Sequence, residues 1–184
     1  MSGTLKKLTF ITGNASKAEQ LSRHLDFPIA HRKVDLVEVQ SLDLMEVVEH
    51  KVKEAYKLMG SPVLIEDTSL IFNALGRLPG PLIKWFLAEL DNEGLARLLD
   101  GYEDRSAKAE VLFGLYDGKT LKTFSGSITG TVPLEPRGGR GFGWDPIFIP
   151  DRYGKTWGEM DAEEQKQVSM RRIALKKLEA ELRR

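Results

Sequence analysis

The pattern of hydrophobic and polar positions predicts strands and helices that alternate along the chain. Short apolar or alternating runs are typical of strands, whereas apolar positions three or four residues apart are typical of helices. The expected strands cover residues 8–12, 34–39, 63–70, 107–116, 121–132 and 147–150. The expected helices cover residues 18–25, 41–59, 82–90, 93–99 and 161–184. The Asp117-Gly118 pair between two strand-like runs predicts a hairpin turn, and the whole pattern predicts an α/β protein.

Two adjacent carboxylates, Glu66 and Asp67, follow the apolar run Val63-Leu64-Ile65. A carboxylate beside such a run is unfavourable to bury unless a metal ion or another cation compensates it. Because successive side chains of a strand point to opposite faces, the two carboxylates are not expected to serve the same site. One is expected to face the chemistry and the other a structural partner. The alternative is a polar strand end that enters a turn.

The first expected strand runs into Gly13-Asn14-Ala15-Ser16-Lys17 and then into a helix. A strand–turn–helix junction directs backbone N–H groups and the positive end of the helix at one place, which suits a phosphate group. Lys17 would lie in the first helical turn, within reach of the same anion. It is not a Walker loop, because the G-x-x-x-x-G-K-[ST] pattern is absent. The alternative is that Asn14 or Ser16 only caps the helix.

The stretch 136–146 is rich in glycine and contains two aromatic residues, Phe142 and Trp144. Glycines let a backbone approach a ligand closely, and in an extended backbone residues two apart share a face. One of these rings could stack on a nucleobase; the alternative is a mobile loop whose aromatic residues fill the core. Lys84 is expected in the first turn of the helix that follows Pro81, where an anion is favoured. Lys51 lies off the apolar stripe of its helix, and by itself it indicates only a solvated surface residue.

Composition narrows the possible functions. The chain has 184 residues, enough for one core or for two lobes that share a sheet. Its 27 basic and 27 acidic residues cancel, which argues against bulk electrostatic binding of nucleic acid or of an anionic membrane. The absence of cysteine excludes disulfides, thiol catalysis and Cys-ligated zinc, and the three histidines form no cluster. With no apolar leader and no run of membrane-spanning length, we expect a soluble cytoplasmic protein.

Five short blocks in this order resemble the Ham1-type inosine triphosphate pyrophosphatases. The blocks are TGNASK at 12–17, EDT at 66–68, LPGPLIKWF at 78–86, FGWDP at 142–146 and TWGEM at 156–160. The resemblance implies a single domain over residues 1–184, with an elongated α/β fold in which helices flank a long mixed β-sheet. It also implies two lobes with a central active-site cleft, and a homodimer.

The implied reaction is Mg²⁺-dependent hydrolysis of a purine nucleoside triphosphate between its α and β phosphates. The products are a nucleoside monophosphate and pyrophosphate. The implied substrates carry non-standard bases, as in ITP, dITP and XTP, so the reaction would keep these bases out of nucleic acids.

The resemblance also assigns residue roles. Glu38 and Asp67 match the metal carboxylates, and Asp67 matches the base that activates the attacking water. Mg²⁺ takes oxygen ligands and bridges phosphates, while lysines neutralise phosphate charge. The residues expected to contact substrate are Thr12, Gly13, Asn14, Lys17, Lys51, Thr68, Lys84, Phe142, Gly143, Trp144, Asp145, Ser169, Met170 and Arg171. Arg171 carries only hydrogen-bond donors, so it suits the 6-oxo group of hypoxanthine and disfavours adenine.

The sequence departs from the family pattern in its last helix. The usual Ser-His-Arg is Ser169-Met170-Arg171, and a usual lysine five residues before that histidine is Gln165. Methionine donates no strong hydrogen bond. The second hypothesis is therefore a nucleotide-binding module with weak or redirected catalysis.

Overall fold

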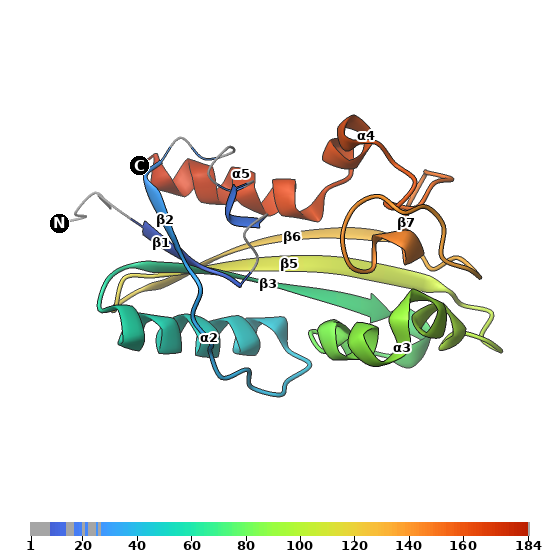
Figure 1. Ribbon diagram of the computed structural model, residues 1–184, viewed down its shortest axis with the longest axis horizontal. Coiled ribbons are helices and arrows are strands. Elements are labelled where there is room, and N and C mark those ends of the chain that lie inside the picture. The colour runs from blue at the N-terminus through green and yellow to red at the C-terminus, as the bar shows by residue number, and fades with distance from the viewer. Residues whose placement is uncertain (1–7, 14–16, 20, 22–24, 26, 184) are drawn as a thin grey trace. The chain divides into compact units, whose positions relative to one another are not determined.

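The computed structural model describes residues 8–13, 17–19, 21, 25 and 27–183. The described strands form one mixed sheet with the order β2-β1-β3-β5-β6-β7, and β4 pairs with β3. The strands are β1 (Leu8–Ile11), β2 (Ile29–Arg32), β3 (Val63–Phe72), β4 (Pro79–Gly80), β5 (Ser106–Tyr116), β6 (Leu121–Thr131) and β7 (Ile149–Pro150). This confirms the prediction of an α/β fold with a mixed sheet and flanking helices (Figure 1).

The helices of the described chain are short to medium in length. They are α2 (Leu44–Met59), α3 (Ile83–Arg97), α4 (Ala162–Gln167) and α5 (Met170–Leu182), with 3₁₀ turns η1 (Asn73–Leu75) and η2 (Asp145–Ile147). None of the helices in this described part combines the length and the apolarity needed to cross a membrane.

The chain divides into two compact units, and the long strands β3, β5 and β6 contribute residues to both. The first unit comprises Met1–Asp67, Val111–Gly126 and Ile173–Arg184. In it β1 pairs in parallel with β2 and with β3. Helix α2 covers one face of these strands, and α5 covers the other (Figure 1). The apolar stripe of α2 packs on the sheet in a cluster that contains Ile11, Val48, Val52, Ala55, Val63, Ile65 and Leu112.

Both ends of α2 follow from the sequence. The Asp43 side chain accepts a hydrogen bond from the Met45 N–H at the N-terminus. Gly60 closes the C-terminus in the left-handed region, at φ 61°, which an L side chain disfavours. These caps hold the helix in the register that places Lys51 beside Asp67. Asp67 lies in the middle of β3, so the alternative of a polar strand end that enters a turn at Glu66 and Asp67 is wrong.

The second unit comprises Thr68–Glu110 and Ser127–Arg172. Here β4 pairs antiparallel with the end of β3, and β7 pairs antiparallel with the end of β6. An aromatic cluster of Trp144, Phe148 and Trp157 forms part of its core, with ring centroids 4.5–6.0 Å apart. Helix α3 is broken at Asp91, whose φ of 52° is not helical. This break separates the two helices predicted at 82–90 and 93–99.

The strand predicted at 34–39 is wrong, because this segment joins no sheet and β2 lies earlier, at Ile29–Arg32. The Val37 N–H bonds the Glu54 carboxylate of α2, at 3.0 and 3.2 Å to its two oxygens, instead of a neighbouring strand. Val34 and Leu36 pack on the α2 cluster while Val37 is exposed. The alternation of apolar and polar residues therefore comes from a loop that packs against a helix.

Two further predictions need adjustment. The single helix expected at 161–184 is interrupted at Val168, whose φ of −119° ends α4 before α5 begins. Of the strand expected at 147–150 only Ile149–Pro150 pairs, because residues 145–147 form η2. Asn14 and Ser16, and part of the helix expected at 18–25, lie outside the described residues.

Candidate active site

The first unit holds a three-residue charge cluster built on Lys51. Its ammonium lies 3.0 Å from Glu38 Oε1 and 2.8 Å from Asp67 Oδ2, and donates a hydrogen bond to each. Lys51 comes from α2, Asp67 from β3, and Glu38 from the segment between β2 and α2. Burial of the ammonium opposes its charge, but Asp67 and Glu38 together outweigh this and raise the pKa of Lys51. The cluster thus places two carboxylates on one cation.

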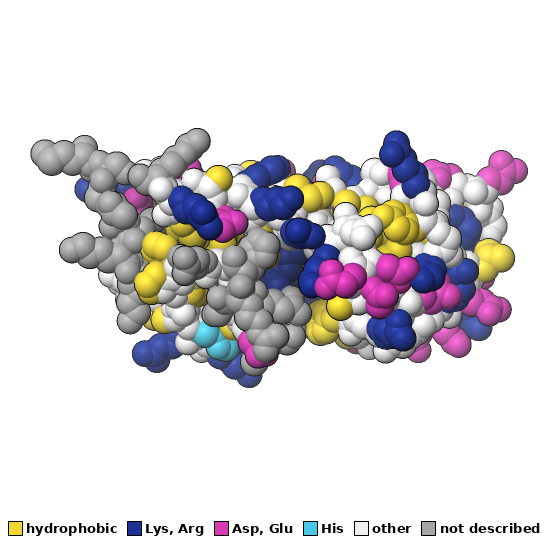
Figure 2. All heavy atoms as spheres, turned by 90° about the horizontal axis from the view of Figure 1, so that it is seen from above, with side chains coloured by type: hydrophobic (Ala, Val, Ile, Leu, Met, Phe, Trp, Pro, Cys, Tyr) yellow, Lys and Arg dark blue, Asp and Glu magenta, His cyan; other side chains and the backbone are white. Residues whose placement is uncertain are grey.

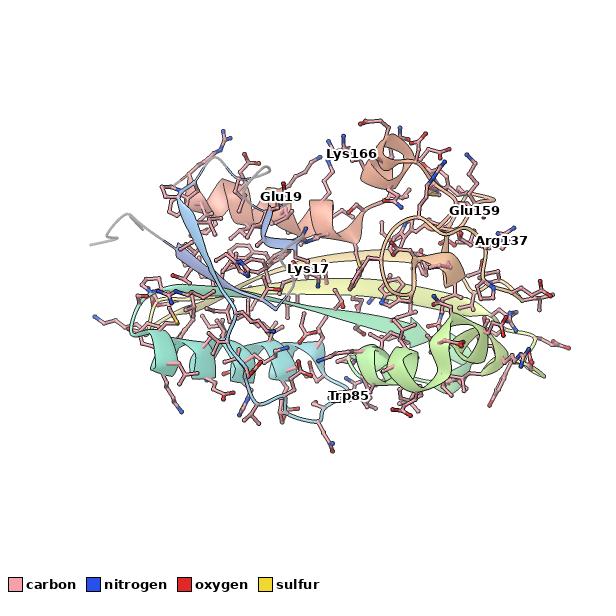
Figure 3. All side chains as sticks on the ribbon, in the orientation of Figure 1. Lys17, Glu19, Trp85, Arg137, Glu159 and Lys166 are labelled. Carbon is pink, nitrogen blue, oxygen red and sulfur yellow. The ribbon has the colours of Figure 1, made fainter. Side chains whose placement is uncertain are left out.

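A second ion pair lies in the same unit. Lys17 Nζ is 3.1 Å from Glu66 Oε1, and the Glu66 side chain is only 1% exposed. Glu66 and Asp67 therefore have different lysine partners, as the alternation of side chains along β3 predicts. Figure 3 shows Lys17 close to the end of β1.

The turn after β1 is partly described. The Thr12 N–H bonds the Arg32 carbonyl at 3.1 Å, and the His31 ring nitrogen lies 2.8 Å from the Thr12 carbonyl oxygen. His31 thus has a hydrogen-bond partner in the backbone. Gly13 is exposed, and Asn14 lies outside the described residues.

The carboxylates of Glu38 and Asp67 fit a magnesium site by their chemistry. Mg²⁺ prefers oxygen ligands and is commonly held by one or two carboxylates together with substrate phosphates and water. Within the described chain, no three or more acidic or histidine side chains gather to enclose a metal ion. Glu38 and Asp67 supply two such carboxylates, and both are bonded to the Lys51 ammonium.

In the second unit the residues Phe142–Asp145 form a tight turn. Asp145 Oδ2 accepts a hydrogen bond of 2.6 Å from the Phe142 N–H, and the Asp145 N–H donates to the Phe142 carbonyl at 3.2 Å. A Cβ on Gly141 would lie 2.0 Å from Asp145 Oδ2, so only glycine leaves room for this carboxylate. Burial raises the pKa of Asp145 to about 6, although the Phe142 N–H favours the charged form.

The two aromatic residues of this turn have different environments. Phe142 is 69% exposed, whereas Trp144 is 8% exposed and packs on Phe148 and Trp157. The backbone between them is not extended, since Gly143 has φ +62°. The shared face predicted for the two rings is therefore wrong. The Phe142 ring is exposed, while Trp144 packs in the core.

Lys84 and Thr68 lie on other elements of this unit. Lys84 is exposed in the first turn of α3, and its ammonium is 5.2 Å from the centroid of the Trp85 ring. Trp85 is itself exposed on the outer side of α3 (Figure 3). Thr68 is half-buried in β3, one residue after Asp67.

The residues around the start of α5 differ in burial and in hydrogen bonding. Ser169 Oγ accepts a hydrogen bond of 3.2 Å from the Arg172 N–H, Met170 is buried, and Arg171 is half-buried. Gln165 donates from Nε2 to the Trp157 carbonyl at 2.7 Å. Gln165 thus ties α4 to the loop that contributes Trp157 to the aromatic cluster.

Two features of the second unit were not predicted from the sequence. Asn92 donates from Nδ2 to the Gly143 carbonyl at 3.0 Å, and no local signal marks a partner 51 residues away. Arg137 and Glu159 lie side by side with 3.6 Å between Nε and Oε2 (Figure 3). Thr156 reinforces this contact, because its hydroxyl donates to the Arg137 carbonyl at 2.7 Å and its N–H donates to the Glu159 carboxylate at 2.8 Å.

The charge distribution agrees with the balanced composition. On the face shown in Figure 2, basic and acidic side chains lie interspersed among the described residues.

Comparison with known proteins places these features in a family. The sequence model of the Ham1 family matches residues 8–181. The Ham1 protein of Staphylococcus aureus is 25% identical, with a TM-score of 0.87 and coverage of 97% of this chain and 98% of that one. A HAM1 protein from Coxiella burnetii is 27% identical, with a TM-score of 0.86 and coverage of 96% and 98%.

A third similar structure carries a functional description. The nucleoside-triphosphatase / dITP/XTP pyrophosphatase of Mycobacterium abscessus is 25% identical, with a TM-score of 0.78 and coverage of 94% of this chain and 98% of that one. The match to the family model extends over nearly all described residues, and the chain belongs to the Ham1 family.

Proposed function

We propose that this protein hydrolyses non-standard purine nucleoside triphosphates, such as ITP, dITP and XTP, to the monophosphate and pyrophosphate. The observation that carries the proposal is the cluster of Glu38, Lys51 and Asp67, in which two carboxylates share one cation at 2.8–3.0 Å. Membership of the Ham1 family, and similarity to a protein described as a dITP/XTP pyrophosphatase, support the same reaction.

Glu38 and Asp67 would hold Mg²⁺. When bound, the ion would compensate phosphate charge and lower the pKa of the attacking water. Asp67 would accept the proton of that water, and the hydrogen bond from Lys51 to Asp67 Oδ2 orients the carboxylate for this role.

Lys17, Lys51 and Lys84 would neutralise the charge of the triphosphate as it redistributes in the transition state. Lys17 and Lys51 each form an ion pair with a carboxylate of β3, so their ammonium groups are held in place without a substrate. Thr12, Gly13 and Asn14 would supply further phosphate contacts, and Thr68 would add one from β3.

The turn Phe142–Asp145 would recognise the base. The exposed Phe142 ring can stack on a purine, and the carboxylate of Asp145 together with the backbone of Gly143 sets the shape of the turn. Trp144 would support this turn from the aromatic cluster.

Arg171 would donate to the 6-oxo group that hypoxanthine and xanthine share, which selects against adenine. Ser169 and Met170 precede it, and the buried Met170 adds an apolar contact instead of a donor. Guanine also carries the oxo group, so its rejection needs exclusion of the 2-amino group. We also propose a homodimer, as the family resemblance implies, and a cytoplasmic location, as expected from the sequence.

The alternative is a nucleotide-binding module with weak or redirected catalysis. It is favoured by Met170, which offers a base no hydrogen-bond donor, and by Gln165, whose amide donates to the Trp157 carbonyl. Initial rates of pyrophosphate release with Mg²⁺, measured for ITP, XTP, GTP, ATP and their deoxy forms, distinguish the two. Chromatography would identify the nucleotide product.

Fast conversion of ITP to IMP, at roughly one per second or more, with ATP a poor substrate, supports the pyrophosphatase. Tight nucleotide binding without pyrophosphate release from any of these nucleotides would contradict it and support the binding module.

A further inference from the structure

Asn92 begins the second segment of α3, directly after the break at Asp91. The Asp91 carboxylate caps this segment, because its Oδ1 accepts hydrogen bonds from the N–H groups of Glu93 at 2.8 Å and Gly94 at 3.1 Å. The break and its cap together fix the backbone that carries Asn92.

The amide of Asn92 reaches the turn that carries Phe142. Its Nδ2 donates to the Gly143 carbonyl at 3.0 Å, and because a carbonyl can only accept, the orientation of the amide is fixed by chemistry. On the other side of Phe142, Asp145 accepts from the Phe142 N–H at 2.6 Å. Two side chains therefore hold the backbone on either side of the exposed ring.

The oxygen of the Asn92 amide, Oδ1, bears on whether the contact with Gly143 serves stability alone. Its Oδ1 is buried and has no hydrogen-bond partner among the described residues. A buried acceptor without a partner is destabilising, whereas an apolar side chain of the same shape would avoid this loss. Part of the stability gained from the bond to Gly143 is therefore lost at Oδ1, while the bond still holds Gly143 in place.

We propose that Asn92 is a positioning residue for base recognition: it holds the Gly143 carbonyl so that the Phe142 ring stays presented to the nucleobase. The proposal rests on the proposed function, because it assumes that Phe142 stacks on the substrate base. Asn92 touches the turn and not the substrate, and it acts on the base end of the nucleotide alone.

Two variants test this. Asn92→Leu keeps the number and branching of the side-chain heavy atoms and removes both the donor and the unpaired oxygen. Asn92→Asp keeps the shape but replaces the donor with a carboxylate oxygen that repels the Gly143 carbonyl. Glu93→Gln, at the exposed neighbouring position of the same helix, is the matched control.

Hydrogen exchange of the peptide covering residues 138–147 is the first readout. We expect exchange at least threefold faster in Asn92→Leu and Asn92→Asp, and unchanged in Glu93→Gln. The KM for ITP should rise about five- to tenfold with kcat within twofold, as expected when only binding of the base is weakened. Inhibition by tripolyphosphate, which lacks a base, should be unchanged.

Unchanged exchange in both Asn92 variants would overturn the proposal, as would an equal loss of tripolyphosphate affinity, which would indicate a general structural defect. If the wild-type protein turns over no nucleotide, the proposed function fails, while the exchange measurement still decides whether Asn92 holds the turn.

Discussion

Lys51 donates a hydrogen bond of 2.8 Å to Asp67, and the same ammonium reaches Glu38 at 3.0 Å. A lysine thus occupies the carboxylate pair that would otherwise attract a metal ion. Removing it should strengthen metal binding and weaken catalysis, because the carboxylates lose a competing cation while the substrate loses a phosphate partner.

Lys51→Met is therefore expected to bind Mn²⁺ about tenfold more tightly without nucleotide, measured by electron paramagnetic resonance. Its turnover of ITP should fall by roughly 100-fold or more. Lys53→Met, which removes an exposed lysine paired with Glu49 on the same helix, is the control and should change neither. Weaker Mn²⁺ binding in Lys51→Met would contradict this interpretation.

Lys17 is predicted to stabilise the fold through Glu66 as well as to bind phosphate. Lys17→Met removes a cation from a carboxylate that is almost fully buried, so it should lower the free energy of unfolding by about 2–3 kcal/mol. Adding Glu66→Gln removes the buried charge and should restore most of that stability in urea unfolding, but not the lost turnover. Restored turnover in the double variant would mean that Lys17 acts only on the fold.

Asp145 should make stability depend on pH in a specific direction. Its folded-state pKa of about 6 lies above the ordinary value near 3.8, so between these values the folded protein holds a proton that the unfolded chain has released. The free energy of unfolding therefore falls as pH rises through this window. Asp145→Asn cannot lose a proton and should not show this fall.

The measurement is urea unfolding of both proteins from pH 4 to pH 7. The stability of Asp145→Asn relative to the wild type should increase by about 2–3 kcal/mol over that range. Other acidic groups are common to both proteins and cancel in the difference. A difference that stays constant with pH would mean that the Asp145 carboxyl titrates in its ordinary range.

Phe142 and Trp144 should respond differently to truncation. Phe142→Ala removes an exposed ring and should leave the free energy of unfolding nearly unchanged, while the KM for ITP rises about tenfold through lost stacking. Trp144→Ala opens a cavity beside Phe148 and Trp157 and should destabilise the fold by about 3–5 kcal/mol. A KM that does not move in Phe142→Ala would exclude this ring from base binding.

Some of the site follows from local rules of the chain. The alternation of a strand is a local property, so the separation of Glu66 and Asp67 onto different lysines could be predicted from β3 alone. The caps of α2 at Asp43 and Gly60 are likewise local, and they place Lys51 in its register.

Other parts depend on contacts between distant segments. The alternation at 34–39 is typical of a strand, yet the Val37 N–H bonds the Glu54 carboxylate of α2. No pattern within 34–39 predicts this contact with a helix. Phe142 is exposed and Trp144 is buried because the backbone of Gly143 between them is left-handed. Glycine adopts left-handed and extended backbone about equally well, so the sequence does not predict which one occurs. The contact between Asn92 and Gly143 exists only once the second unit has folded.

The most direct test of the carboxylate cluster is the turnover of ITP by Asp67→Asn, measured as pyrophosphate release with saturating Mg²⁺. Asparagine keeps an oxygen that can accept from Lys51 but provides neither a negative metal ligand nor a base. Asp35→Asn, an exposed change in the segment that carries Glu38, is the control. We expect Asp67→Asn to lose at least about 100-fold in kcat while Asp35→Asn stays within twofold. Equal turnover of Asp67→Asn and the wild type would contradict a catalytic role for the cluster of Glu38, Lys51 and Asp67.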